Sequence, residues 1–124
     1  MKLEIKSREE SGVVILSLSG RLVMGDEVKA LREQIRSLLA SQKKHILLNL
    51  AECAYVDSSG IGTLVEGVVM AATEGGRLKL ANLQRMVHSA LVVHKMIPAF
   101  QIFNYEAEGI ASFAPAGGTG STGQ

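Results

Sequence analysis

The chain has 124 residues, of which 47% are hydrophobic and 20% are charged, and its formal net charge is +1. This length suits one domain with its own buried core, and the near-balanced charge gives no electrostatic basis for binding nucleic acid or an anionic membrane. Cys53 is the single cysteine, so an intrachain disulfide is excluded. The sequence has no signal-peptide core, and no apolar run approaches the roughly 18 residues that span a bilayer. These features predict a cytoplasmic protein.

The first half of the sequence predicts a hairpin, a helix and a buried strand. Alternating apolar and polar residues predict a half-buried strand around residues 3–5, and a turn over 8–12 leads into a second strand over 13–18. The short connection implies antiparallel pairing of these strands. A helix is expected to open at Gly25 and Asp26, because apolar residues then recur at intervals of three or four. The continuous apolar run over 45–50 is typical of a strand buried on both faces.

The second half predicts alternating helices and strands. A helical pattern begins after Asp57 and ends at Gly75 and Gly76, and a short strand follows over 78–81. A helix over 84–95, a strand over 100–103 and a short helix over 106–113 complete the pattern. The remaining residues, 114–124, are rich in Gly, Ser and Thr and are expected to form a flexible tail behind a single domain over 1–113.

This order of elements predicts an α/β fold. The sheet should be mostly parallel and mixed, with an N-terminal antiparallel hairpin and helices that alternate with the later strands. The carboxyl ends of parallel strands share one edge of a sheet, where open α/β sheets place their sites. Segments 21–25, 57–62 and 82–84 should therefore meet at one edge. The apolar residues Leu22, Val23 and Met24 in the first of these segments either fill the core or form a docking surface.

The segment VDSSGIGTL, residues 56–64, lies at the centre of this edge. Asp57 is expected to cap the helix by accepting hydrogen bonds from its first turn, which places the Ser58 hydroxyl near solvent beside the positive helix end. An aspartate cap alone is common and is usually structural. Each glycine inside a helix costs about 1 kcal/mol relative to alanine, and less in the first turn. This cost favours a close approach, by the sheet at Gly67 and by an outside partner at Gly60 and Gly62.

The sequence resembles the STAS domain of bacterial anti-sigma factor antagonists. The resemblance is carried by SGRL at the end of the second strand, by HILLNL, by VDSSGIGTL and by GGRLKLANL, and it covers residues 1 to about 113. It implies a STAS-like fold and a partner-switching protein. An anti-sigma factor with serine kinase activity binds the unmodified form of such a protein and phosphorylates it, and a phosphatase resets the cycle.

The resemblance also implies the site residues. Ser58, directly after Asp57, corresponds to the phosphorylated serine. The implied partner surface comprises Arg21, Leu22, Val23, Met24, Asp26, Asp57, Ser59, Gly60, Ile61 and Gly62. Val23 stands where many relatives carry an acidic residue, which changes the usual charged contact to the kinase. No cofactor is implied.

Other functions fit the sequence less well than this hypothesis. A hydrolase with a serine nucleophile is disfavoured because the G-x-S-x-G pattern is absent. A metal site on the third helix is disfavoured because His88 and His94 lie six residues apart, whereas a helical metal pair has a spacing of four. A phospho-aspartate receiver lacks the acidic cluster that holds Mg²⁺, and no phosphate-binding P-loop is present. The protein is therefore not expected to be an enzyme. The alternative left open is a STAS scaffold that is not phosphorylated and serves a signalling or transport assembly.

Overall fold

The computed structural model describes residues 2–114 and confirms the predicted alternation of strands and helices. The elements are β1 (Glu4–Glu10), β2 (Val13–Leu22), α1 (Asp26–Ala40), β3 (His45–Val56), α2 (Ser58–Thr73), β4 (Arg77–Ala81), α3 (Arg85–Val93), a short 3₁₀ helix (Ile97–Ala99), β5 (Ile102–Phe103) and α4 (Glu106–Ala111). The tail predicted over 114–124 lies, apart from its first residue, outside the described residues.

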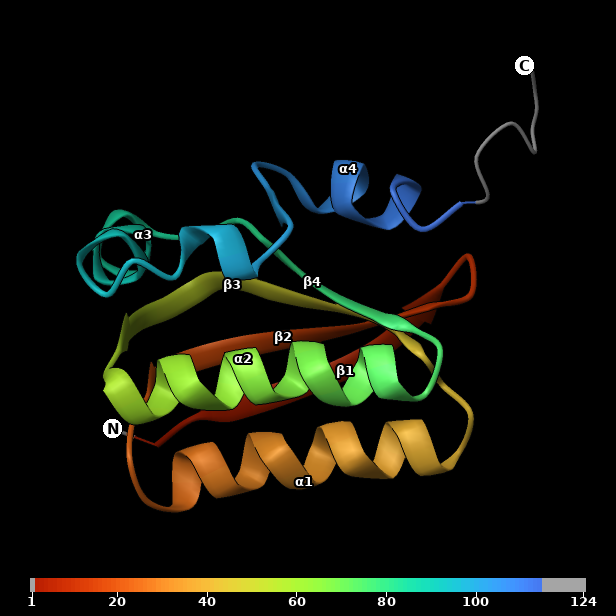
Figure 1. Cartoon of the computed structure of the whole chain (residues 1–124), viewed down its shortest axis with the longest axis horizontal. Coiled ribbons are helices and arrows are strands. Elements are labelled where there is room, and N and C mark those ends of the chain that lie inside the picture. Colours follow the sequence, from red (N-terminus) through yellow and green to blue (C-terminus); the bar gives the residue numbers. More distant parts are fainter. Residues whose placement is uncertain (1, 115–124) are drawn as a thin grey trace.

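The strands form one mixed sheet in the order β1-β2-β3-β4-β5 (Figure 1). β1 and β2 pair antiparallel, and each later pair of neighbouring strands is parallel. This arrangement confirms the predicted fold class. The carboxyl ends of β2 and β3 lie together, and the segments that follow them meet as expected, since the Met24 N–H donates to the Asp57 carboxylate. The expectation that segment 82–84 joins them was wrong. β4 ends at Ala81, level with Asn49, while β3 continues to Val56, and the Gln84 amide donates to the Ala51 carbonyl instead.

β1 continues to Glu10, through residues that were expected to form a turn, because Arg8, Glu9 and Glu10 still pair with β2. Two further strands are also longer than the sequence pattern predicted. β2 continues past Leu18 to Leu22, and β3 continues past Leu50 to Val56, because the two strands keep pairing through Arg21 with Tyr55 and Leu22 with Val56. The register shifts twice in this pair, which interrupts the regular alternation that a sequence pattern can detect. The expected loop at residues 21–25 is therefore shorter, since its first two residues belong to β2.

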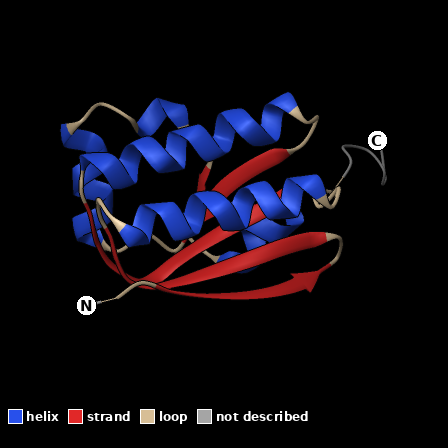
Figure 2. Cartoon of the chain, turned by 90° about the horizontal axis from the view of Figure 1, so that it is seen from below, coloured by secondary structure: helices blue, strands red, loops and turns tan. Residues whose placement is uncertain are grey.

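The core has two parts, one on each face of the sheet. Residues such as Leu16, Leu48 and Leu80 pack against α1, α2 and the buried residues of α3 in the larger cluster. Ile15 and Leu47 point to the other face and form a smaller cluster with residues of β5 and α4. Figure 1 shows α1 and α2 on one side of the strands and α4 on the other, and Figure 2 shows the two long helices lying side by side over the sheet. The site-bearing helix α2 is thus part of the main core layer.

The short helix α4 is held over the sheet by polar contacts at both ends. At its start, the Glu106 carboxylate accepts hydrogen bonds from Arg8 at 2.7 Å and from the Asn49 amide at 2.7 Å. At its end, the Lys79 ammonium donates to the Ser112 carbonyl at 3.1 Å and to the Ser112 hydroxyl at 2.9 Å, and it lies 4.3 Å from the centre of the Phe113 ring. Lys79 is only 6% exposed, so it is a buried cation that α4 covers.

This burial predicts a distinctive pH dependence for the Lys79→Met variant. Desolvation by burial, together with the nearby Arg77 cation, lowers the pKa of Lys79 in the folded protein. The unfolded chain therefore keeps this proton to higher pH, so the free energy of unfolding should rise as pH increases from the lowered pKa toward the ordinary lysine value. Urea denaturation across an alkaline pH series should show this rise in the parent and not in Lys79→Met.

The exposed lysine of β1, Lys6, provides the matched control. Lys6→Met should retain the alkaline rise of the parent. An unfolding free energy that differs between the parent and Lys79→Met by the same amount at every pH would contradict this account of Lys79.

Candidate functional site

The Asp57 carboxylate joins the β2–α1 loop to the start of α2. Its Oδ1 accepts a hydrogen bond from the Gly60 backbone N–H at 2.7 Å, and its Oδ2 accepts one from the Met24 backbone N–H at 2.9 Å. The backbone of Asp57 is extended, and its N–H donates to the Leu22 carbonyl at 3.3 Å. These contacts confirm the predicted N-cap and add a link that the sequence did not indicate. One side chain thereby fixes the β2–α1 loop against the start of α2 at this edge of the sheet.

Gly60 allows α2 to approach the end of β2. A Cβ on this residue would overlap the Leu22 carbonyl oxygen, whereas a Cβ on Gly62 would meet nothing within 4 Å. The expectation that an outside partner requires Gly60 was therefore wrong, because the close neighbour is the protein's own backbone. At Gly67 a Cβ would lie 3.0 Å from side chains of Ile35 on α1 and Leu78 on β4. The helix and the sheet together explain that glycine, largely as predicted.

Ser58 is the first residue of α2, and it is exposed. The next residue, Ser59, is half-buried, and its carbonyl accepts a hydrogen bond from the Thr63 hydroxyl at 3.0 Å. The free backbone N–H groups and the helix dipole give this end of α2 a positive potential. The geometry therefore presents an exposed serine at the N-terminus of α2, directly beside the Asp57 carboxylate that caps the helix.

The residues predicted to contact a partner divide by exposure. Arg21, Met24, Asp26 and Gly62 are exposed, Val23, Asp57 and Ser59 are half-buried, and Leu22, Gly60 and Ile61 are buried. Leu22 is 0% exposed and Ile61 is 4% exposed, so both side chains belong to the core. These two residues, with Gly60, lie beneath the edge that carries Ser58 and expose almost no side chain on its surface. The exposed surface of this edge is formed by Ser58 and by the β2–α1 loop that carries Met24.

Tyr55 is a surface residue of this edge that the sequence analysis missed. It lies on β3, is 36% exposed, and has the Arg21 guanidinium 5.3 Å from the centre of its ring. Tyrosine and arginine are the residue types that most often dominate the energy of protein–protein interfaces. Arg21 pairs with Tyr55 across β2 and β3. The sequence pattern could not indicate this pair, because it predicted that both strands end before these residues.

Other chemistry at the site is limited. Cys53 lies near the edge but is 0% exposed, and desolvation raises the pKa of its thiol, which keeps it protonated and unreactive. Within residues 2–114, no three His, Cys, Asp or Glu side chains are grouped so that they could hold a metal ion. In the same part of the chain, none of the helices combines the length and the apolar character needed to cross a membrane.

The Asp57→Ala variant should lose both hydrogen bonds of the carboxylate. Loss of an N-cap costs about 0.5–2 kcal/mol, and the lost contact with the Met24 amide adds about 1 kcal/mol. Urea denaturation should therefore show a decrease in unfolding free energy of about 1–3 kcal/mol. Asp26→Ala, which removes an exposed carboxylate from the first turn of α1, is the control. An equal loss in both variants would argue against the link.

Gly60 and Gly62 provide a matched pair of substitutions. Gly60→Ala should destabilise the fold by about 1–3 kcal/mol, because the new methyl group meets the backbone of Leu22. Gly62→Ala should be neutral or stabilise by up to about 1 kcal/mol, because the site is open and alanine favours a helix. Thermal or urea unfolding measures both. Equal effects would show that the contact with β2 is not what requires Gly60.

Comparison with known proteins shows the family to which this chain belongs. The family model "STAS domain" matches residues 4–109. The chain is 24% identical over 110 residues to the anti-sigma F factor antagonist of Paenibacillus polymyxa, covering 89% of this chain and 94% of that protein.

Solved structures show the same fold. An anti-sigma factor antagonist from Mycobacterium paratuberculosis aligns with a TM-score of 0.80 at 15% identity, covering 90% of this chain and 94% of that one. The phosphorylated form of the Bacillus cell fate determinant SpoIIAA aligns with a TM-score of 0.69 at 19% identity, covering 90% of this chain and 100% of that one. Because the family model matches most of its length, the chain belongs to the STAS domain family.

Proposed function

We propose that this protein is an anti-sigma factor antagonist that acts by partner switching. In its unmodified form it binds an anti-sigma factor with serine kinase activity, and phosphorylation of Ser58 by that kinase releases it. A phosphatase restores the unmodified form. The chain is then the substrate of the kinase and not an enzyme itself, and it works in the cytoplasm through protein partners.

The observation that carries this proposal is the exposed Ser58 hydroxyl at the start of α2, on an edge braced by Asp57. The Paenibacillus polymyxa relative is named an anti-sigma F factor antagonist, and one structure with the same fold is of a phosphorylated form. These relatives support the class of partner, and the exposed serine supports the site of modification.

Electrostatics suggests how phosphorylation would act. A phosphoserine adds about −1.5 to −2 charges. At a helix N-terminus such a charge is favourable by about 0.3–1 kcal/mol, so it should not unfold α2. The effect must then arise between molecules, where the phosphate occupies a surface that had fitted the partner. A hundredfold loss of affinity needs only about 2.7 kcal/mol, which one desolvated, unpaired phosphate group can supply.

The loop beside Ser58 suggests that apolar contacts contribute strongly to binding. Val23 is half-buried, and the next residue, Met24, is 73% exposed. Asp26 is the exposed first residue of α1, beyond this apolar pair. A partner would thus meet Met24 and Tyr55 near Ser58. The replacement of the family's common acidic residue by Val23 is also what favours the alternative function, a STAS scaffold that is not phosphorylated.

Phosphate mapping tests the proposed site. The purified protein is incubated with ATP and, in turn, each anti-sigma factor kinase of its host, and the product is analysed by mass spectrometry. We expect one phosphate on Ser58, none on Ser58→Ala, and an unchanged yield on Ser59→Ala. Modification of Ser59 would contradict the site assignment. If no host kinase modifies the protein but one of its anti-sigma factors binds it tightly, the scaffold function is the better description.

A further inference from the structure

The outward face of α2 is apolar along most of its length. Among its sixteen residues, SSGIGTLVEGVVMAAT, the only charged one is Glu66. Val69 is 58% exposed, and Ala72 is also exposed. A surface helix normally turns charged and polar residues toward solvent. This face is therefore better suited to contact with another protein than to water.

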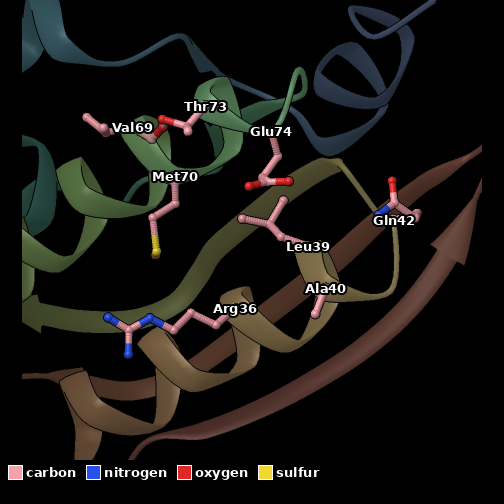
Figure 3. A pocket seen from close by; sticks show the side chains of 8 residues that line it. All are labelled: Arg36, Leu39, Ala40, Gln42, Val69, Met70, Thr73 and Glu74. Carbon is pink, nitrogen blue, oxygen red and sulfur yellow. Dashed lines mark hydrogen bonds between the residues drawn. The ribbon is translucent and has the colours of Figure 1, made fainter.

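A groove opens between the C-terminal halves of α1 and α2 (Figure 3). Its volume is about 370 Å³. Leu39, which is 6% exposed, and Ala40 line it from α1, and Val69 and Met70 line it from α2. Figure 3 shows the Met70 side chain extending from α2 toward α1. The groove is thus largely apolar and large enough to take bulky side chains from a partner.

One end of the groove, where Arg36 lies, carries an excess of positive charge. The Glu66 carboxylate lies 2.8 Å from the Arg32 guanidinium and 3.9 Å from that of Arg36. Two cations therefore share one carboxylate, and the Arg36 side chain remains 60% exposed. Glu74, the acidic residue that lines the groove, lies at its opposite end. A partner group that enters level with Arg36 is favoured if it is acidic.

Helical geometry connects this groove to Ser58. Ser58, Gly62, Val65 and Val69 follow one another at spacings of four, three and four, which places them along one line of the helix. Ser58 and Val69 are separated by about 16 Å at 1.5 Å per residue. A standard protein interface covers about 800 Å² on each partner, or a patch about 30 Å across. A partner whose contact is centred between Ser58 and Val69 therefore covers both without an unusually large interface.

We propose that the anti-sigma factor contact continues from Ser58 along the outer face of α2 and ends in the groove between α1 and α2. The occupant of the groove is an amphipathic helix of that anti-sigma factor, with apolar residues against Val69 and Met70 and an acidic residue beside Arg36. The inference rests on the proposed function. It assigns part of the affinity to a region that phosphorylation of Ser58 does not touch.

The test uses the full chain and the host anti-sigma factor that binds it, with affinity measured by calorimetry. Val69→Glu should weaken binding by about tenfold or more, as expected for a buried interface residue. Arg36→Glu should weaken it by about fivefold, and its effect should shrink at high salt because the contact is electrostatic. Tyr105→Glu, which alters a residue 64% exposed beside α4, is the matched control and should change affinity by less than about twofold. Unchanged thermal unfolding of the variants verifies that each one folds.

The outcomes separate this inference from the proposed function. Val69→Glu and Arg36→Glu binding as tightly as the parent, while Ser58→Asp binds weakly, would overturn the groove and leave the proposed function standing. If no host anti-sigma factor binds the unmodified parent, both fail. If the parent is a dimer that Val69→Glu converts to a monomer, a second copy of the chain occupies the groove and the inference is wrong.

Discussion

The edge of the sheet that carries Ser58 depends on one carboxylate. Asp57 accepts a hydrogen bond from the Gly60 N–H on one oxygen and from the Met24 N–H on the other, and so joins the start of α2 to the loop after β2. Without these bonds, the first turn of the helix would lose a partner for one of its free amides, and the loop would lose its attachment to the sheet edge. The negative charge is also favourable at the positive end of the helix. Ser58 is therefore presented from a braced surface and not from a free loop.

The same helix combines close internal packing with an open outer face. Gly60 and Gly67 bring its inner side against Leu22, Ile35 and Leu78, which leaves little freedom for the helix to shift. Beyond Ser58 and Ser59, its outer side is mostly apolar as far as the groove beside Arg36. A rigid platform of this kind can bind a partner at little entropic cost to itself, and it can be switched by changing one group on its surface. This arrangement is why we assign the effect of phosphorylation to the contact between molecules.

Much of this structure was predictable, because periodicity and capping are local signals. The order of elements and the N-cap at Asp57 follow from residues near one another in the sequence. The unpredicted features depend on distant residues. The full length of β2 and β3 required their register through two shifts, the role of Gly60 required the position of the Leu22 carbonyl, and the link from Asp57 to Met24 required the path of the loop. The buried Lys79 similarly finds its partner, Ser112, only in the folded chain.

The most direct test of the account is amide hydrogen exchange at Met24 and Gly60, compared between the unmodified protein and the protein phosphorylated on Ser58, with anti-sigma factor affinity measured on the same samples. We expect both amides to remain equally protected while affinity falls by about a hundredfold, because the Asp57 bonds persist and only the docking surface changes. Loss of protection at both amides on phosphorylation would show instead that the modification loosens the start of α2, and it would contradict the central claim.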